Sequence, residues 1–146
     1  MSKIQKKVQV WIVNHTSIED WYLILRVIPK RGGGWHPITG SVEPDEVKTK
    51  DWLAAAQRET QEETGIAPES GKWVDLKLKF EFDGRFGHAE EHAFGLVLNE
   101  FKGALVLDPK EHVGMRWVTL SEAQKSLGFD SQLRALTEFS CYHSNA

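Results

Sequence analysis

The pattern of apolar and polar residues predicts a series of β-strands separated by short turns. Residues 8–13 and 21–28 are rich in β-branched and aromatic side chains, and the turn-forming residues 14–17 between them favour a hairpin. Residues 73–82 alternate apolar with polar positions, as expected of a strand with one buried face. The pattern also predicts strands over residues 91–98 and 113–120 and a turn over residues 83–87.

Helices are predicted in the middle and at the end of the chain. Residues 52–57 are a run of good helix formers, and Gly65 ends this helix as a residue that tolerates the left-handed conformation. A short capped helix is predicted at residues 121–124. An amphipathic helix is predicted over residues 130–142, with one side formed by Leu133, Leu136 and Phe139. This order of elements predicts an α/β fold, a mixed sheet sandwiched between helices.

Length and composition narrow the picture to one domain over residues 1–146. The chain is 40% hydrophobic and 27% charged, which is ordinary for a globular domain. Its net charge of −3 gives no reason to expect a nucleic acid duplex as partner. Local Lys and Arg and bound metal must therefore receive any polyphosphate. The single cysteine, Cys141, excludes an internal disulfide framework and a cysteine-based zinc site. No apolar run reaches membrane-spanning length, and no apolar signal core follows the basic residues 1–7. We therefore expect a cytoplasmic protein without a membrane partner.

The most informative chemistry lies in the middle helix, where Glu59, Glu62 and Glu63 stand at positions i, i+3 and i+4. These carboxylates fall within roughly a 100° arc of one helix face. Like charges at this spacing repel each other, whereas hard divalent cations favour clustered carboxylate oxygens. The two interpretations are a solvated acidic face and a metal site, and the residues before the helix favour the second.

Residues 35–46 have loop chemistry, with Gly and Pro as punctuation, and lead into the acidic helix. Together the two segments resemble the signature of the Nudix hydrolase (MutT-like) family, whose positions are filled by Gly40, Glu46, Arg58, Glu59, Glu62, Glu63, Gly65 and Ile66. Two features depart from that signature. Eleven residues separate Glu46 from Arg58 where the family has seven, and Thr60 replaces a larger apolar residue. The four extra residues amount to about one helical turn. Either the helix begins a turn early or residues 47–50 bulge out, and the role of Glu46 stays open.

Two further segments narrow the resemblance within the family. Residues 39–43 and residues 111–117 are similar to loops of the bacterial dihydroneopterin triphosphate pyrophosphatases. Related segments occur in dinucleoside polyphosphate hydrolases and other nucleotide pyrophosphohydrolases. The resemblance implies α/β/α layering and a pyrophosphohydrolase that uses Mg²⁺, or Mn²⁺, to cleave a nucleoside or pterin triphosphate to monophosphate and pyrophosphate. The alternatives are a dinucleoside polyphosphate hydrolase and a Nudix-like binding or regulatory module.

For the reaction centre, the one-turn spacing of Glu59 and Glu63 predicts a shared metal ion, with Glu62 as a further ligand or as an acceptor behind the ligands. Arg58 is expected to pair with a carboxylate and hold its rotamer. Glu111 is implied by resemblance to bring a carboxylate to the metal from outside the helix. It is also the first candidate for the general base, with Glu62 second. The resemblance further implies a metal ligand in the Thr39 carbonyl, and Gly40 would permit close backbone approach.

Substrate contacts are predicted from charge and aromaticity. Lys7, Arg26 and Arg31 are candidates for binding phosphates, although a solvated surface is the competing interpretation for each. Trp35 is a candidate for stacking on a base or pterin ring. His88 and His92 would share one strand face with Glu90 while Glu91 points the other way, and an ordinary edge-strand surface is favoured there over a zinc site. A homodimer is compatible with the sequence.

Overall fold

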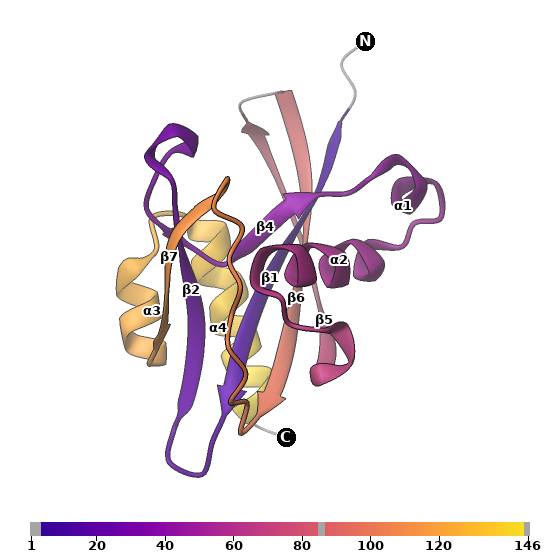
Figure 1. The fold of residues 1–146 in the computed structure, drawn as a ribbon. Coiled ribbons are helices and arrows are strands. Elements are labelled where there is room, and N and C mark those ends of the chain that lie inside the picture. Colours follow the sequence, from indigo (N-terminus) through magenta and orange to yellow (C-terminus); the bar gives the residue numbers. More distant parts are fainter. Residues whose placement is uncertain (1–3, 85–86, 145–146) are drawn as a thin grey trace.

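The protein, described by a computed structural model for residues 4–84 and 87–144, is built on one mixed seven-stranded sheet (Figure 1). The path through this sheet is β3-β2-β1-β6-β5, with β4 paired to β1 and β7 paired to β2. The β1–β6 pairing is parallel and the other pairings are antiparallel. The strands are β1 (Gln5–His15), β2 (Asp20–Val27), β3 (Trp35–His36), β4 (Ile38–Ser41), β5 (Lys72–Gly84), β6 (Gly87–Asn99) and β7 (His112–Val118).

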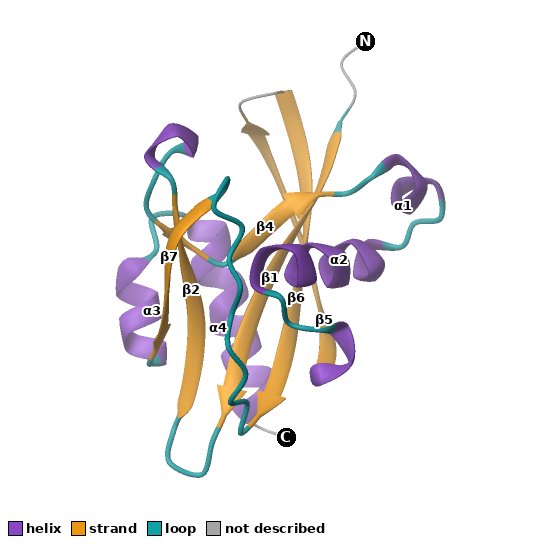
Figure 2. Cartoon of the chain, in the orientation of Figure 1, coloured by secondary structure: helices purple, strands orange, loops and turns teal. Residues whose placement is uncertain are grey.

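Helices cover both faces of the sheet, which confirms the α/β fold and its layering (Figure 2). The helices are α1 (Pro44–Lys48), α2 (Trp52–Thr64), α3 (Leu120–Ser126) and α4 (Asp130–Ser144), with 3-10 turns η1 (Pro29–Arg31) and η2 (Pro68–Ser70). Ala55 and Ala56 of α2 are buried in one apolar core. Leu136 and Phe139 of α4 are buried in a second core on the opposite face, and Ala123 of α3 joins them.

Strand β1 changes its partner along its length, and this change opens the sheet. Its C-terminal end pairs with β2, from Val13 to His15. Nearer its N-terminus it pairs instead with β4, where Val8 lies opposite Gly40. Strand β2 continues away from β1 and pairs with β7. The fork between β4 and the β2–β7 pair brings the loop before β7 close to α2.

Several predicted boundaries shift in the structure. The segment expected to be a loop before α2 contains β3 and β4, because the ladders offered by β2 and β1 satisfy its backbone groups. The strand predicted over 113–120 ends at Val118. Thr119 then caps α3 in a reciprocal capping box with Glu122. Of the predicted turn at 83–87, residues 85 and 86 lie outside the described residues, as do residues 1–3 of the basic start.

The four extra residues do not lengthen the acidic helix, which begins at Trp52. They contribute to a separate short helix, α1, followed by Lys50 with a left-handed φ of 55°. Asp51 caps the new helix by accepting a hydrogen bond from the Ala54 amide at 3.0 Å. The early helix start is therefore wrong, and the alternative in which residues 47–50 leave the helix describes the chain.

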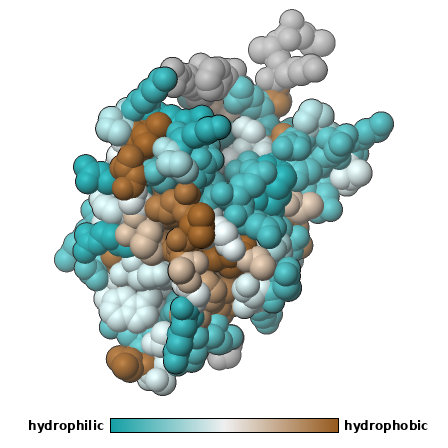
Figure 3. Space-filling view, viewed as in Figure 1, coloured by the Kyte–Doolittle hydropathy of each residue, from teal (hydrophilic) through white to brown (hydrophobic). Residues whose placement is uncertain are grey.

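The face that carries α2 is mostly polar, with a limited apolar area near its middle (Figure 3). An extended segment, residues 100–111, runs along this side before β7 (Figure 1). It is fixed to the end of α2 by a hydrogen bond from the Val106 amide to the Thr64 carbonyl at 2.8 Å. None of the described helices is both long and apolar enough to cross a membrane.

Candidate active site

The acidic site begins with the way α2 meets the sheet. The buried positions of α2 are Ala55, Ala56, Thr60, Glu63 and Thr64, so one carboxylate lies on the face that packs inward. Thr60, which stands where the family usually has a larger apolar residue, is fully buried. The helix stops at Gly65, whose left-handed conformation directs its amide to the Gln61 carbonyl.

A cavity of ≈ 460 Å³ lies at the fork in the sheet and collects most of the predicted site residues. It is bounded by strands β1 and β4, by helix α2 and by the loop that enters β7. The predicted residues that line it are Lys7, Arg31, Thr39, Gly40, Glu59, Glu63 and Glu111. The structure therefore brings together residues that are more than 100 positions apart in the chain, as a binding site requires.

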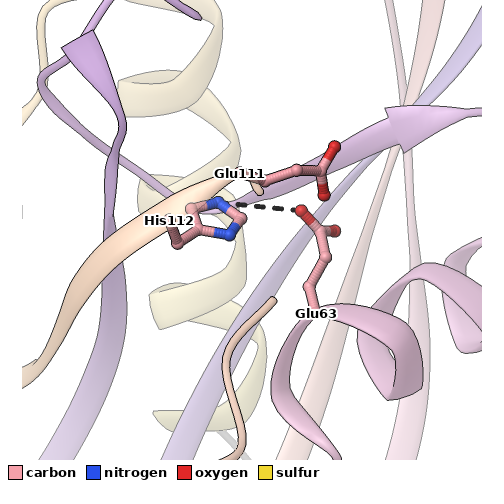
Figure 4. Close-up of side chains that lie close together, drawn as sticks. All are labelled: Glu63, Glu111 and His112. Carbon is pink, nitrogen blue, oxygen red and sulfur yellow. Dashed lines mark ion pairs between the residues drawn. The ribbon is translucent and has the colours of Figure 1, made fainter. Parts of the chain in front are cut away.

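Glu63, Glu111 and His112, which all line this cavity, lie close together (Figure 4). One potential ligand atom from each lies within 4.8 Å of the others. The His112 Nε2 atom is 3.7 Å from Glu63 Oε1. Glu63 is only 2% exposed, and its Oε2 atom has no hydrogen-bond partner among the described residues. The His112 Nδ1 atom is likewise buried and unpartnered within that part of the chain.

The electrostatics of the cavity are dominated by Glu63, an acid that pairs with no Lys or Arg in the described part of the chain. Burial, followed by the charges of Glu59 and Glu111, raises the pKa of Glu63 to about 10. Burial also raises the pKa of Glu59, against the opposing effect of Arg58. Burial lowers the pKa of His112, so this imidazole does not supply the missing positive charge. A buried acid with unused acceptor atoms beside two other carboxylates fits a divalent cation.

Gly40 allows Glu59 to lie against the backbone of β4. A Cβ atom at this position would stand 2.2 Å from Glu59 Cδ and 2.5 Å from its Oε2. No real side chain tolerates such distances, so the predicted need for close approach at Gly40 has a concrete cause. Thr39, the preceding residue, also lines the cavity, where its carbonyl remains a predicted ligand.

Arg58 binds the acidic side chains on the side of α2 that faces away from Glu63. Its guanidinium donates to both carboxylate oxygens of Glu46, at 3.1 and 2.9 Å, and to the Ser41 carbonyl at 2.9 Å. It also donates to Glu59 at 3.0 Å and to Glu62 at 3.2 Å. This pairing lowers the pKa of Glu46. The open question about Glu46 is thus answered: it stays at the site's edge as the bidentate partner of Arg58, in spite of the extra residues.

Besides Arg58, three predicted site residues do not line the cavity. The Glu62 side chain is 56% exposed and pairs with Arg58, because its helix position is turned away from the buried one that Glu63 occupies. Arg26 is exposed on β2. Trp35 packs against the α4-side core with Arg116 lying 6.0 Å from its ring, so it is not placed to stack on a substrate in this cavity.

Sequence reasoning missed His112, which lines the cavity together with His36. The available signal for His112 was its position directly after Glu111. At the other histidine pair, His92 bonds Glu90 and His88 bonds Asp83, at 3.3 and 3.2 Å. The one metal-compatible cluster in residues 4–84 and 87–144 is that of Glu63, Glu111 and His112, which leaves the zinc alternative without support.

The fold and the acidic cavity define a Nudix-type hydrolase, and comparison with known proteins agrees. A sequence model described as the NUDIX domain matches residues 5–139. The chain therefore belongs to the Nudix family, as its signature predicts. Among curated protein sequences the comparison found no match.

Solved structures share the fold at low sequence identity. An Ap4A hydrolase from C. elegans, in a binary complex, superposes with a TM-score of 0.84 and 23% identity, covering 98% of this chain and 100% of that one. The dihydroneopterin triphosphate pyrophosphohydrolase of E. coli gives a TM-score of 0.76 and 23% identity, covering 94% and 97%. The NUDIX domain of Shewanella oneidensis NrtR, complexed with ADP ribose, gives 0.75 and 11%, covering 96% and 88%.

Proposed function

We propose that this Nudix hydrolase is a metal-dependent pyrophosphohydrolase that converts a nucleoside or pterin triphosphate into a monophosphate and pyrophosphate. The observation that carries the proposal is the buried carboxylate of Glu63, whose Oε2 atom has no hydrogen-bond partner among the described residues and which lies beside Glu59 and Glu111 in a cavity large enough for a polyphosphate. Such an arrangement destabilises the empty protein, and binding of a divalent cation would remove the penalty.

Glu59, Glu63 and Glu111 are the residues that would hold Mg²⁺ or Mn²⁺, with the Thr39 carbonyl as a further oxygen donor. Their oxygen atoms are the ligands that these cations prefer. A bound divalent cation neutralises phosphate oxygens and lowers the pKa of a coordinated water. Glu62 stays a candidate ligand only in a rearranged helix, because Arg58 holds it at the solvent side.

Two cations of the protein itself border the cavity and would bind phosphates. Lys7 enters from β1, and Arg31 follows η1 with its Nη1 atom 3.2 Å from Glu111 Oε1. A phosphate would compete with Glu111 for this guanidinium, because Arg matches phosphate and carboxylate geometry equally well. Binding of the polyphosphate would thereby free the Glu111 carboxylate.

Glu111 is the general base in this proposal. Its side chain is 29% exposed, so it can reach water, and it lies next to the buried acid. It accepts the proton of a water molecule while the water oxygen bonds to an internal phosphorus. The bond from that phosphorus to its bridging oxygen breaks, and pyrophosphate leaves. Glu62, the second candidate, is not placed for this step because it lies outside the cavity.

The second candidate function is hydrolysis of a dinucleoside polyphosphate. It is favoured by one observation, the full-length superposition on the C. elegans Ap4A hydrolase. The binding or regulatory alternative is disfavoured, since every signature acid is present and the acids assemble around a cavity.

A substrate panel in labelled water tests the proposal. The panel contains nucleoside triphosphates, dihydroneopterin triphosphate, diadenosine polyphosphates and nucleotide sugars, each with Mg²⁺ and with Mn²⁺. We expect turnover of a triphosphate with release of pyrophosphate, and ¹⁸O from water in one product only. Release of orthophosphate alone, or activity confined to dinucleoside polyphosphates or nucleotide sugars, would contradict the substrate class.

A further inference from the structure

A second cavity, of ≈ 660 Å³, adjoins the acidic one. Both are lined by Lys7, His36, Thr39 and Phe82, so a ligand can extend from one into the other. The second cavity lies on the α4 side of the sheet, between β5 and β6 and the first turn of α4. It contains none of the carboxylates assigned to metal or to water activation.

Glu91 is the unexplained charged group of this second cavity. It lies on β6 opposite Lys7 of β1 and Phe80 of β5, and it is only 5% exposed. Gln9 Nε2 donates to Glu91 Oε1 at 2.8 Å. Burial raises the pKa of Glu91, while the Gln9 bond and the positive charge of Lys7 act in the opposite direction. A buried carboxylate at a cavity wall is expensive for a fold, and the catalytic proposal makes no use of it.

The orientation of the Glu91 side chain is fixed by Gln9 and Trp11, which lie on the neighbouring strand β1. Trp11 Nε1, which can only donate, bonds Gln9 Oε1 at 2.9 Å. This bond sets the Gln9 amide, so its nitrogen must face Glu91. Gln9 and Trp11 are both fully buried. In the described part of the chain Gln9 is the one hydrogen-bond donor to Glu91, which leaves Oε2 with acceptor capacity toward the cavity.

Gln132 supplies a second acceptor. His36 Nε2 lies 2.8 Å from the Gly33 carbonyl, to which it must donate, so its Nδ1 is an acceptor. Gln132 Nε2 donates to that Nδ1 at 3.1 Å. The remaining atom of the amide, Oε1, is buried and has no partner among the described residues. Gln132 is 6% exposed and lines the same cavity as Glu91.

Aromatic side chains complete the walls. Phe80 and Phe82 contribute from β5, and Phe129 from the residue before α4. Phe82 is 36% exposed and Phe129 58% exposed, so both rings present accessible apolar surface at the cavity. Flat apolar faces with two hydrogen-bond acceptors suit a planar heterocycle that carries N–H donors.

We infer that this cavity, through Glu91, binds the 2-amino-4-oxopyrimidine ring shared by guanine and pterins. The ring nitrogen N–H and the adjacent amino group of this heterocycle are two neighbouring donors that match one carboxylate. Adenine offers an amino donor beside a ring acceptor, and the acceptor would face the carboxylate oxygen unpaired. The inference rests on the proposed function, because the acidic cavity must hold the phosphates of the same molecule.

Binding of monophosphates in the absence of divalent metal tests the inference apart from catalysis. Titration calorimetry with GMP, neopterin monophosphate, IMP and AMP would be run on the wild type, on Glu91→Gln and on the control Glu138→Gln. Glu138 is exposed on α4 and undergoes the same loss of charge. IMP keeps the ring N–H and lacks the amino group, so it should bind with intermediate affinity.

We expect GMP and neopterin monophosphate to bind the wild type more tightly than AMP. Glu91→Gln should weaken them by about 10- to 100-fold, the range for a hydrogen bond to a charged group, and change AMP binding little. The tighter of the two ligands identifies nucleotide or pterin as the source of the ring. Equal affinity for GMP and AMP, or an equal loss for all four ligands, would overturn the inference.

If Glu91→Gln fails to fold by circular dichroism, Gln132→Met provides the second test, since it removes the other acceptor with similar volume. It should weaken GMP more than AMP, and an equal effect on both would overturn the inference. The two proposals fail separately. Selective binding without hydrolysis of any triphosphate contradicts the proposed function only, and hydrolysis without ring selectivity contradicts the heterocycle site only.

Discussion

Helix α2 carries carboxylates in two contrasting states. On its outer side, Glu62 and the neighbouring Glu46 of α1 share the guanidinium of Arg58. On its inner side, Glu63 is buried with one oxygen unpartnered among the described residues, and the groups around it are acidic or neutral. Glu59 lies between the two states, because it faces the cavity and also accepts from Arg58.

The two sides of this helix therefore have different roles: the outer acids stabilise the fold, and the inner acids are available to a metal ion. The outer acids are neutralised by a fixed cation of the protein, so they hold α1, α2 and β4 together. Among the inner acids, Glu59 accepts from Arg58 and Glu111 pairs with Arg31. In the described part of the chain no Lys or Arg pairs with Glu63, and its burial destabilises the fold unless a cation is bound. The spacing of acidic residues alone therefore does not identify a metal site. The metal site is identified by a buried acid that no Lys or Arg of the protein neutralises.

Neutralising the inner acid should have the largest effect. Glu63→Gln keeps the shape of the side chain and removes its charge, so we expect turnover to fall by roughly three orders of magnitude or more. At neutral pH the metal-free variant should melt at a higher temperature than the wild type, because Glu63, whose pKa is raised to about 10, must take up a proton on folding and Gln need not. The matched control is Glu62→Gln. Comparable loss in both variants would remove the distinction between the two sides of the helix.

Displacing Glu59 should have the next largest effect. Gly40→Ala places a methyl group where the Glu59 carboxylate lies, so we expect activity to fall by about 100-fold, as for a misplacement near 1 Å. The fold should lose about 1–3 kcal/mol through overpacking. Steady-state kinetics and thermal melting measure both. Gly128→Ala is the control, because its new methyl group meets no atom within 4 Å; full activity of Gly40→Ala would contradict the close approach.

Weakening the outer network should have a moderate effect. Arg58→Lys keeps the charge but cannot make the bidentate pair with Glu46, and we expect a loss of about 1–2 kcal/mol in unfolding free energy. Activity should fall roughly tenfold because the Glu59 rotamer is less restrained. Denaturant unfolding and kcat are the readouts. A variant that is as stable as the wild type would show that Arg58 does not tie α1 to α2.

The smallest effect concerns pH. The folded pKa of Glu63, about 10, lies above its ordinary value of 4.5, so its contribution to stability is fully present below about pH 4.5 and is lost as the pH rises toward 10. The metal-free wild type should therefore melt at lower temperature as the pH is raised through this range. Mg²⁺ should restore stability most at the alkaline end, since metal replaces the proton. A melting temperature that rises with pH without metal, or an equal Mg²⁺ effect at every pH, would contradict this.

Local patterns were sufficient for much of this molecule. Strand β5 and helix α4 follow from periodicity, because each buries one face. The hairpin of β1 and β2 follows from β-branched and aromatic runs, whose residues are buried on both faces of the sheet. Glu59 and Glu63 were found because their spacing is a property of one helix. Arg58 was expected to pair with a carboxylate, and the structure names Glu46, Glu59 and Glu62 as its partners.

Features that depend on contacts between residues far apart in the chain could not be predicted from local sequence patterns. Strands β3 and β4 are too short to show a pattern and exist because β2 and β1 offer them ladders. The break between α1 and α2 depends on a left-handed Lys50, which no propensity predicts. Trp35 was predicted to stack on the substrate ring, yet it pairs with β2 and packs against the α4-side core. Glu91 was expected to point away from the histidine face of β6, but only the packing of α4 shows that a cavity lies there.

Equilibrium Mn²⁺ binding without substrate, followed by electron paramagnetic resonance, tests directly whether the inner acids hold the metal. It compares the wild type with Glu63→Gln and Glu62→Gln, which lose the same charge from the two sides of one helix. If the inner acids hold the metal, Glu63→Gln weakens Mn²⁺ binding by roughly 100-fold or more and Glu62→Gln by less than about threefold. An equal loss in both variants, or a larger loss in Glu62→Gln, would contradict the account.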